Sequence, residues 1–272
     1  MIRENSTADG RELIAAAFKK AQERQTAALM PYFTLGYPDI ETSLDVVEAI
    51  AGSSDLLEIG IPFSDPLADG PTVQHSTQIA LENGVTVAGC MEMVARLRQR
   101  GVNTPACFMG YYNPILAYGT ERFVRDARTT GIQGLIVPDL PPEEAAELAG
   151  YASEAGLAYI YFLAPTSNEA RIRQVTAKAS GFIYLASLTG VTGARTALRS
   201  DLEAFVGRVQ AHTEIPLAVG FGISTPEQAA TVGALADGVI VGSALINAVD
   251  EADEKANAAK AFVGAMQAAL GR

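Results

Sequence analysis

Eight short apolar runs recur along the chain, and each is followed by a segment whose apolar residues have helical spacing. The runs span residues 28–35, 56–61, 106–111, 134–137, 158–163, 182–186, 217–219 and 239–241. The helical segments span 40–51, 73–100 with a break near Gly84, 115–130, 143–155, 168–179, 197–212, 226–235, 244–249 and 253–270. Buried strands that alternate with helices form βαβ units and a parallel sheet, and eight units allow that sheet to close. The pattern predicts a (β/α)8 barrel, with an extra N-terminal helix over 10–25.

The length of the chain agrees with one such barrel. A chain of 272 residues with 49% hydrophobic residues can bury a large core, and a barrel of about 250 residues is ordinary at this length. No Pro/Gly/Ser-rich linker, composition shift or low-complexity tract divides the sequence. We therefore predict a single α/β domain over residues 1–272.

Charge and cysteine usage exclude several classes of protein. The formal charge of -11 disfavours nucleic-acid binding. Cys90 and Cys107 lack CxxC spacing, so neither a disulfide framework nor a zinc site is indicated. The N-terminus lacks a basic region followed by an apolar core, and no apolar run reaches about 18 residues. We expect a soluble cytoplasmic protein that does not contact a membrane.

The second apolar run contains a carboxylate, Glu58, close to its end. Because an unpartnered ionisable group in a core costs several kcal/mol or has a raised pKa, Glu58 is either paired structurally or poised to exchange a proton. The loop that follows is stiffened by prolines and presents Ser64, Asp65 and Asp69. A second carboxylate on a rigid loop favours the functional interpretation. In this fold the chemistry lies at the C-terminal ends of the strands, which is where Glu58 and this loop are expected.

Glycine-rich turns follow the last three apolar runs. They are Gly190-Val191-Thr192-Gly193, Gly220-Phe221-Gly222-Ile223-Ser224 and Gly242-Ser243. Glycines let the backbone approach an anion, and serines can cap helices whose N-terminal amides carry partial positive charge. The turns predict a phosphate site, and the alternative is a set of capped glycine turns without a ligand.

The long segment 188–199 after the sixth run is rich in glycine and threonine. Beside a phosphate site, a loop of this length is typical of a lid that excludes water. An ordinary mobile loop is the alternative. Arg195 is a candidate to approach the phosphate, although arginines in such loops are more often exposed to solvent.

The placement of the lysines and histidines excludes several kinds of catalysis. All lysines fall in predicted helices, so a Schiff-base aldolase has no nucleophile at a strand end. The two histidines, His75 and His212, lie in separate helical segments, which disfavours a histidine-bound metal. No strand-GxGxxG-helix unit indicates a dinucleotide site. Carboxylate acid/base chemistry on a phosphorylated substrate remains, with Mg²⁺ held by Asp65, Asp69, Asp139 and Glu58 as an open alternative.

The segment 57–71, Leu-Glu-Ile-Gly-Ile-Pro-Phe-Ser-Asp-Pro-Leu-Ala-Asp-Gly-Pro, closely resembles the signature of the tryptophan synthase alpha subunit family. Further stretches support the resemblance: Phe33-Thr34-Leu35-Gly36-Tyr37-Pro38, Gly110-Tyr111-Tyr112-Asn113-Pro114, Val137-Pro138-Asp139-Leu140-Pro141, Gly190-Val191-Thr192-Gly193 and Gly220-Phe221-Gly222-Ile223. The resemblance covers nearly everything after the leading helix.

The resemblance implies that the chain cleaves indole-3-glycerol phosphate to indole and glyceraldehyde 3-phosphate. Glu58 would protonate indole C3 and take a proton from the glycerol hydroxyl, while Asp69 would hydrogen-bond the ring nitrogen. The residues implied to hold the phosphate are Gly193, Gly222, Gly242 and Ser243. Those implied to line or position the indole site and its lid are Phe221, Tyr111, Tyr184 and Thr192. For the aromatic residues, a plain core role is the alternative.

The resemblance also implies a partner, a pyridoxal-phosphate beta subunit that receives indole through a tunnel in an alpha2beta2 tetramer. Pro62, Asp65 and Asn113 match positions expected at that interface, and no cofactor or metal is expected in this chain. Leu188 departs from relatives that carry arginine there, which puts any charged lid contact at that position in doubt. The alternatives are a stand-alone lyase, a non-catalytic activating subunit, and another phosphate-binding barrel aldolase or isomerase.

Overall fold

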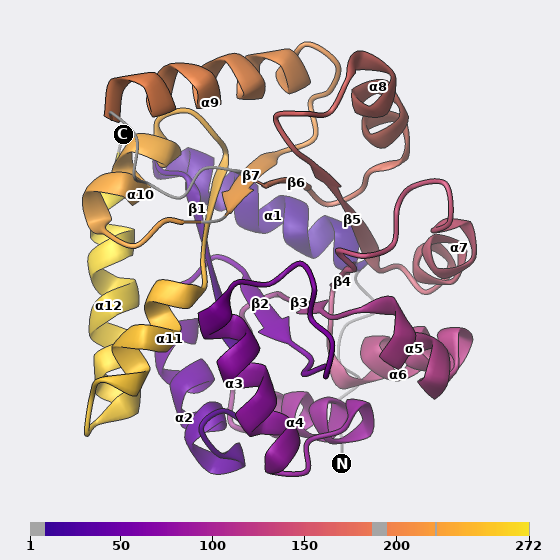
Figure 1. Cartoon of the computed structure of the whole chain (residues 1–272), viewed down its shortest axis with the longest axis vertical. Helices are drawn as coiled ribbons and strands as arrows, with labels where there is room; N and C mark the ends of the chain where they lie inside the picture. Colours follow the sequence, from indigo (N-terminus) through magenta and orange to yellow (C-terminus); the bar gives the residue numbers. More distant parts are fainter. Residues whose placement is uncertain (1–8, 187–194, 221, 272) are drawn as a thin grey trace.

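Parallel strands form a closed barrel in the computed structural model, which describes residues 9–186, 195–220 and 222–271. Within these residues the eight strands follow chain order around the barrel, and β8 pairs with β1 (Figure 1). They are β1 (Ala28–Thr34), β2 (Leu57–Gly60), β3 (Ala106–Met109), β4 (Gly134–Ile136), β5 (Ala158–Leu163), β6 (Ile183–Ala186), β7 (Leu217–Gly220) and β8 (Gly238–Val241). The predicted (β/α)8 barrel is confirmed.

Helices surround the barrel and connect its strands (Figure 1). They are α1 (Gly10–Glu23), α2 (Ile40–Ala51), α3 (Pro71–Glu82), α4 (Val87–Gln99), α5 (Tyr112–Tyr118), α6 (Thr120–Thr130), α7 (Ala146–Glu154), α8 (Glu169–Lys178), α9 (Arg195–Gln210), α10 (Pro226–Gly233), α11 (Ser243–Asp250) and α12 (Lys255–Ala269). The single helix predicted over 115–130 is instead two, because Gly119 has a φ of 96° that an α-helix does not accommodate. None of the helices found in the described part of the chain has the length and apolar character needed to cross a membrane.

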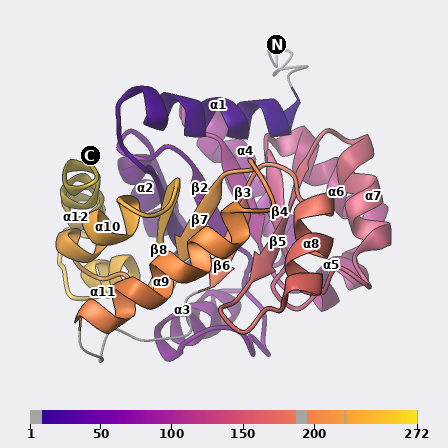
Figure 2. The same ribbon diagram turned by 90° about the horizontal axis from the view of Figure 1, so that it is seen from above.

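The extra N-terminal helix α1 closes one end of the barrel. Its first residue, Gly10, donates a backbone hydrogen bond of 2.7 Å to the carbonyl of Gly156. On its buried face, the ring of Phe18 lies 5.8 Å from that of Phe182, which directly precedes β6. Figure 2 shows α1 across one end of the barrel and α3 near the opposite end. Since α1 covers the N-terminal ends of the strands, a site must form at their C-terminal ends.

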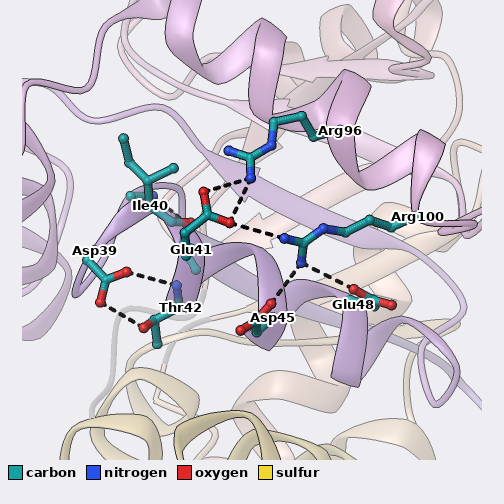
Figure 3. Close-up of polar contacts among 10 residues, drawn as sticks. Asp39, Ile40, Glu41, Thr42, Asp45, Glu48, Arg96 and Arg100 are labelled. Carbon is teal, nitrogen blue, oxygen red and sulfur yellow. Dashed lines mark hydrogen bonds and ion pairs between the residues drawn. The ribbon is translucent and has the colours of Figure 1, made fainter.

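Helices α2 and α4 are joined on the outside of the barrel by ion pairs (Figure 3). Arg96 contacts Glu41 at 2.6 Å, and Arg100 contacts Asp45 at 2.7 Å and Glu48 at 3.3 Å. The carboxylates are exposed, so each pair contributes roughly 0–1 kcal/mol. These contacts link the two helices, and none of the residues involved lines the cavity at the strand ends.

Candidate active site

A cavity of about 210 Å³ opens where the strands end. It is lined by Tyr32, Glu58, Asp69, Val73, Met109, Tyr184, Gly222, Ile223, Ser224, Ile240, Gly242, Ser243, Ala244 and Asn247. Six of the residues predicted for the site therefore meet in one place: Glu58, Asp69, Tyr184, Gly222, Gly242 and Ser243. Met109 ends β3 and Gly242 directly follows β8, so the cavity that Glu58 lines lies at the C-terminal ends of the strands.

Glu58 is a buried acid on β2, with only 2% of its surface exposed. Its Oε2 atom is buried and has no hydrogen-bond partner among the described residues. Burial, followed by the nearby charge of Asp69, raises the pKa of Glu58 to about 8. The side chain therefore carries a proton at neutral pH, and no other group in the described protein binds that oxygen.

Asp69, on the loop between β2 and α3, is the second carboxyl of the cavity. Burial raises its pKa to about 6, while a hydrogen bond of 3.0 Å from the Tyr111 hydroxyl opposes this rise. The same hydroxyl accepts a bond of 2.9 Å from the Ala68 amide. At neutral pH Asp69 is thus largely ionised while Glu58 is protonated. Two carboxyls whose pKa values are held apart can act as one acid and one anion.

A second wall of the cavity is formed by the turns after β7 and β8. Gly222 has a φ of 77°, a left-handed conformation that glycine adopts without strain. Helix α10 has a complete capping box made by Thr225 and Gln228, whereas α11, which begins at Ser243, has no side-chain cap. An uncapped helix N-terminus beside glycines suits an anion such as phosphate.

A second depression, called the outer depression, lies along the acidic loop, which is the segment 61–70 between β2 and α3. Its lining residues are Phe63, Asp65, Leu67, Ala68, Tyr111, Asn113 and Asp139. Tyr111, predicted beside the indole, lines this depression and reaches the cavity only through its bond to Asp69. Asp65 and Asn113, two of the three residues predicted at a partner interface, lie here together, whereas Pro62 is buried within this chain.

The magnesium alternative does not fit this arrangement. Asp139 accepts the Tyr112 amide at 2.9 Å at the start of α5 and lines the outer depression, whereas Glu58 lines the inner cavity. Across the described ranges, no three His, Cys, Asp or Glu side chains are grouped so that they could hold a metal ion. The four acidic residues considered for Mg²⁺ are therefore not brought together.

Tyr32 is a cavity residue that the sequence analysis missed. It lies opposite Glu58 in the pairing of β1 with β2. Its hydroxyl lies over Gly60, where a Cβ would come within 2.3 Å of the oxygen. Tyr184 has the same relationship to Gly220, at 2.2 Å, across β6 and β7. The available signal was Tyr32 and Thr34 at alternating positions of an otherwise apolar strand.

Some predicted positions lie outside the described residues. They are Thr192, Gly193, Phe221 and Leu188, and with them most of the predicted lid. The C-terminal part of that predicted lid is not a loop, because α9 begins at Arg195, two residues before the helix predicted from 197. The side chain of Arg195 is not described.

Comparison with known proteins gives one consistent answer. The family model for the tryptophan synthase alpha chain matches residues 18–270. A tryptophan synthase alpha chain from Chloroflexus aggregans is 49% identical over 262 residues, which are 95% of this chain and 98% of the relative. One from Citrifermentans bemidjiense is 52% identical over 234 residues, covering 86% of this chain and 87% of the relative.

Solved structures agree in fold along nearly the whole chain. A chain from Mycobacterium tuberculosis tryptophan synthase has a TM-score of 0.87 at 38% identity, covering 95% of this chain and 98% of its own. The tryptophan synthase subunit alpha from Legionella pneumophila has a TM-score of 0.88 at 37% identity, with the same coverage. The barrel, the paired carboxyls and these matches together place the chain in the tryptophan synthase alpha chain family.

Proposed function

We propose that the chain is the alpha subunit of a tryptophan synthase and cleaves indole-3-glycerol phosphate to indole and glyceraldehyde 3-phosphate. The observation that carries the proposal is the Glu58 carboxyl, which is buried, protonated at neutral pH and without a partner for Oε2 inside the cavity. A structural carboxyl would be expected to have its oxygens bonded. A buried carboxyl oxygen that has no partner and faces a cavity at the strand ends is suited to give its proton to a ligand.

Glu58 supplies the proton that makes indole a leaving group. Protonation of indole C3 makes that carbon tetrahedral and places positive charge on the ring nitrogen. The Glu58 carboxylate left behind then takes the proton of the adjacent glycerol hydroxyl. As that proton leaves, the carbon-carbon bond breaks, the hydroxyl carbon becomes an aldehyde, and the bonding electrons neutralise the ring. Glu58 regains its proton, so a pKa of about 8 suits both transfers.

Asp69 stabilises the charge that develops during this reaction. With a pKa of about 6 it is largely ionised at neutral pH, and it can accept a hydrogen bond from the ring N–H. Tyr111 holds the carboxylate in place from the outer side of the loop. A fixed anion at a site of developing positive charge lowers the barrier without reorganisation.

The phosphate is assigned to the wall formed by the turns after β7 and β8, at Gly222, Gly242 and Ser243. The glycines permit close approach of the backbone, and the start of α11 favours negative charge. Phosphate at one wall and carboxyls at the other align the three-carbon chain across the cavity. Thr192, Gly193 and Phe221 remain proposals for the remaining contacts.

The partner proposed is a beta subunit that carries pyridoxal phosphate, in an alpha2beta2 tetramer. The depression with Asp65 and Asn113, next to an exposed Leu67, supports a docking surface on the outer side of the acidic loop. Pyridoxal phosphate would react with serine in the beta subunit. In this chain all lysines lie in helices, as predicted, and none is placed at a strand end. The chain's own part is to form indole and deliver it to the partner.

Indole release from indole-3-glycerol phosphate, measured with and without a beta subunit, tests the proposal. We expect slow release by the chain alone and a strong increase with the partner. Fast release without any partner would identify a stand-alone lyase. Glu58→Gln should nearly abolish release, whereas Glu23→Gln, the same change at an exposed position of α1, should not. Full activity of a folded Glu58→Gln chain would refute the role of Glu58.

A further inference from the structure

Three buried hydroxyl groups form a chain from the cavity to helix α3. The Tyr32 hydroxyl lies 3.2 Å from the Thr34 hydroxyl, which lies 2.8 Å from that of Ser76. Ser76 in turn donates a hydrogen bond of 2.9 Å to the carbonyl of Val73. Thr34 and Ser76 are both fully buried, at 0% exposure. The chain links β1 to the first turns of α3, which follow the loop that carries Asp69.

Only one direction of donation satisfies all three of these contacts at once. Each hydroxyl has one proton to donate, and the carbonyl of Val73 can only accept. When all three contacts are satisfied together, Ser76 donates to Val73, Thr34 donates to Ser76, and Tyr32 donates to Thr34. In this arrangement the Tyr32 proton is engaged by Thr34, and the Tyr32 oxygen keeps a lone pair that can accept a hydrogen bond. Toward the cavity it can act only as a hydrogen-bond acceptor.

The position of Tyr32 shows which part of a ligand its oxygen faces. Its hydroxyl reaches across to β2 and lies over Gly60, which is on the same face as Glu58 and one step nearer the strand's C-terminal end. The base of its side chain packs at the other wall, since a Cβ on Gly242 would lie 3.3 Å from the Tyr32 Cβ. Tyr32 thus spans the distance between the phosphate wall and the carboxyl wall.

We propose that the Tyr32 hydroxyl accepts a hydrogen bond from a hydroxyl of the three-carbon chain of the bound substrate and so selects for a hydroxylated chain. This inference rests on the proposed function, because that function places the phosphate and the indole at the two walls. An acceptor that loses its solvent in a closed cavity costs free energy unless a donor replaces the water. The hydroxyl chain strengthens the preference for a ligand with a hydroxyl donor. Because the Tyr32 proton is engaged by Thr34, Tyr32 cannot instead donate to a ligand that offers only an acceptor.

The test compares indole-3-glycerol phosphate with indole-3-propyl phosphate, an analogue in which both chain hydroxyls are replaced by hydrogen. The kcat/KM for the substrate and the competitive inhibition constant of the analogue are measured for the wild type and for Tyr32→Phe. We expect Tyr32→Phe to lower kcat/KM about tenfold, the value of one hydrogen bond. Inhibition by the analogue should not weaken and should become somewhat stronger, because Tyr32→Phe removes the acceptor that the analogue leaves without a donor. Equal losses for both ligands, or no loss for either, would overturn the proposal.

Variants at Thr34 distinguish the effect of the hydroxyl chain from the effect of side-chain packing. Thr34→Val removes the acceptor for the Tyr32 proton, so Tyr32 can turn its proton toward the cavity and loses its fixed orientation. We expect a lower kcat/KM for the substrate, while Thr34→Ser, which keeps the hydroxyl, should recover most of that loss. Thermal unfolding of each variant verifies folding, and the Thr34 pair decides the matter if Tyr32→Phe does not fold. Equal losses in Thr34→Val and Thr34→Ser would contradict the proposal.

The same assay distinguishes failure of the proposed function from failure of the proposed role of Tyr32. Wild-type chain that releases no indole, with or without a beta subunit, overturns the proposed function and this inference with it. Wild-type chain that is active while Tyr32→Phe is equally active overturns only the role of Tyr32.

Discussion

The Tyr111 hydroxyl donates a hydrogen bond of 3.0 Å to Oδ2 of Asp69 and accepts one of 2.9 Å from the amide of Ala68. One phenol therefore holds both the backbone and the carboxylate of the acidic loop. Because a donor stabilises the charged form of a carboxyl, this bond lowers the pKa of Asp69 against the effect of burial. Tyr111 lines the outer depression and not the cavity. It nevertheless lowers the pKa of the Asp69 carboxyl inside the cavity.

The two carboxyl pKa values predict a bell-shaped pH dependence of kcat/KM. The proposed reaction needs Glu58 protonated and Asp69 ionised, so the rate should fall above a pH of about 8 and below a pH of about 6. Steady-state indole release between pH 5 and 9.5 measures both limbs. A rate that keeps rising to pH 9.5 would contradict Glu58 as the acid.

Replacing Tyr111 should move only the acid limb of that profile. Tyr111→Phe removes the donor to Asp69, so the pKa of Asp69 should rise and the limb should shift to higher pH. A substrate phosphate also titrates near pH 6, and this shift distinguishes Asp69 from it. The control is Tyr118→Phe, which removes a similar hydroxyl bond of 2.8 Å to Asp126 on the outside of the barrel. An unmoved limb in Tyr111→Phe would assign it to the phosphate.

Protein stability should depend on pH through Glu58. The unfolded chain loses this proton near its usual value of 4.5, whereas the folded chain keeps it to about 8. Between these values the folded state binds the extra proton, so the free energy of unfolding falls as pH rises, by about 1.4 kcal/mol per pH unit at most. Glu58→Gln removes the titration, and its melting temperature should fall less between pH 5 and 9 than that of the wild type. Glu23→Gln is the matched control. Parallel curves for Glu58→Gln and wild type would mean that Glu58 titrates normally.

The sequence predicted the barrel and its carboxyl pair because both depend on local patterns. Eight apolar runs separated by amphipathic segments specify the topology whatever the helix boundaries are, and a carboxylate such as Glu58 stands out in an apolar strand. Tyr32 could not be assigned in the same way, since an aromatic residue in a strand usually packs in a core. Its role depends on Gly60 and Ser76, which are distant in sequence and meet only after the barrel closes. The same holds for Tyr111, whose side of the loop depends on packing.

Two arginines at the C-terminal end of α4, the partly buried Arg98 and the exposed Arg100, should differ sharply in their effect on stability. Arg98 donates to the carbonyls of Gly131 at 2.7 Å, Val102 at 2.8 Å and Thr104 at 2.7 Å. Burial lowers its pKa to about 10. Arg98→Met leaves these carbonyls unpaired and should cost about 2–4 kcal/mol. Arg100→Met, which breaks exposed ion pairs, should cost less than about 1 kcal/mol. Chemical denaturation measures both, and equal costs would contradict the distinction.

A methyl group added at Gly60 in β2 or at Gly220 in β7 should disturb the tyrosine whose hydroxyl lies over that glycine. A Cβ at residue 60 would lie 2.3 Å from the Tyr32 oxygen, and one at residue 220 would lie 2.2 Å from the Tyr184 oxygen. Both rings are enclosed by the barrel, so Gly60→Ala and Gly220→Ala should displace them, lower stability by about 1–3 kcal/mol and reduce kcat/KM. Gly150→Ala is the control, because nothing lies within 4 Å of its added Cβ in α7.

A double-mutant cycle shows whether the clash is the cause. If the methyl group acts by displacing the Tyr32 ring, Tyr32→Ala has already removed what Gly60→Ala disturbs, and the two losses in kcat/KM should not add. Tyr32→Phe is unsuitable here, because its Cζ and Cε2 atoms would still lie 2.6 and 2.8 Å from the added Cβ. The kcat/KM of the double variant should then be no lower than that of the less active single variant. Additive losses would mean that Gly60→Ala acts through the β2 backbone and not by displacing the Tyr32 ring.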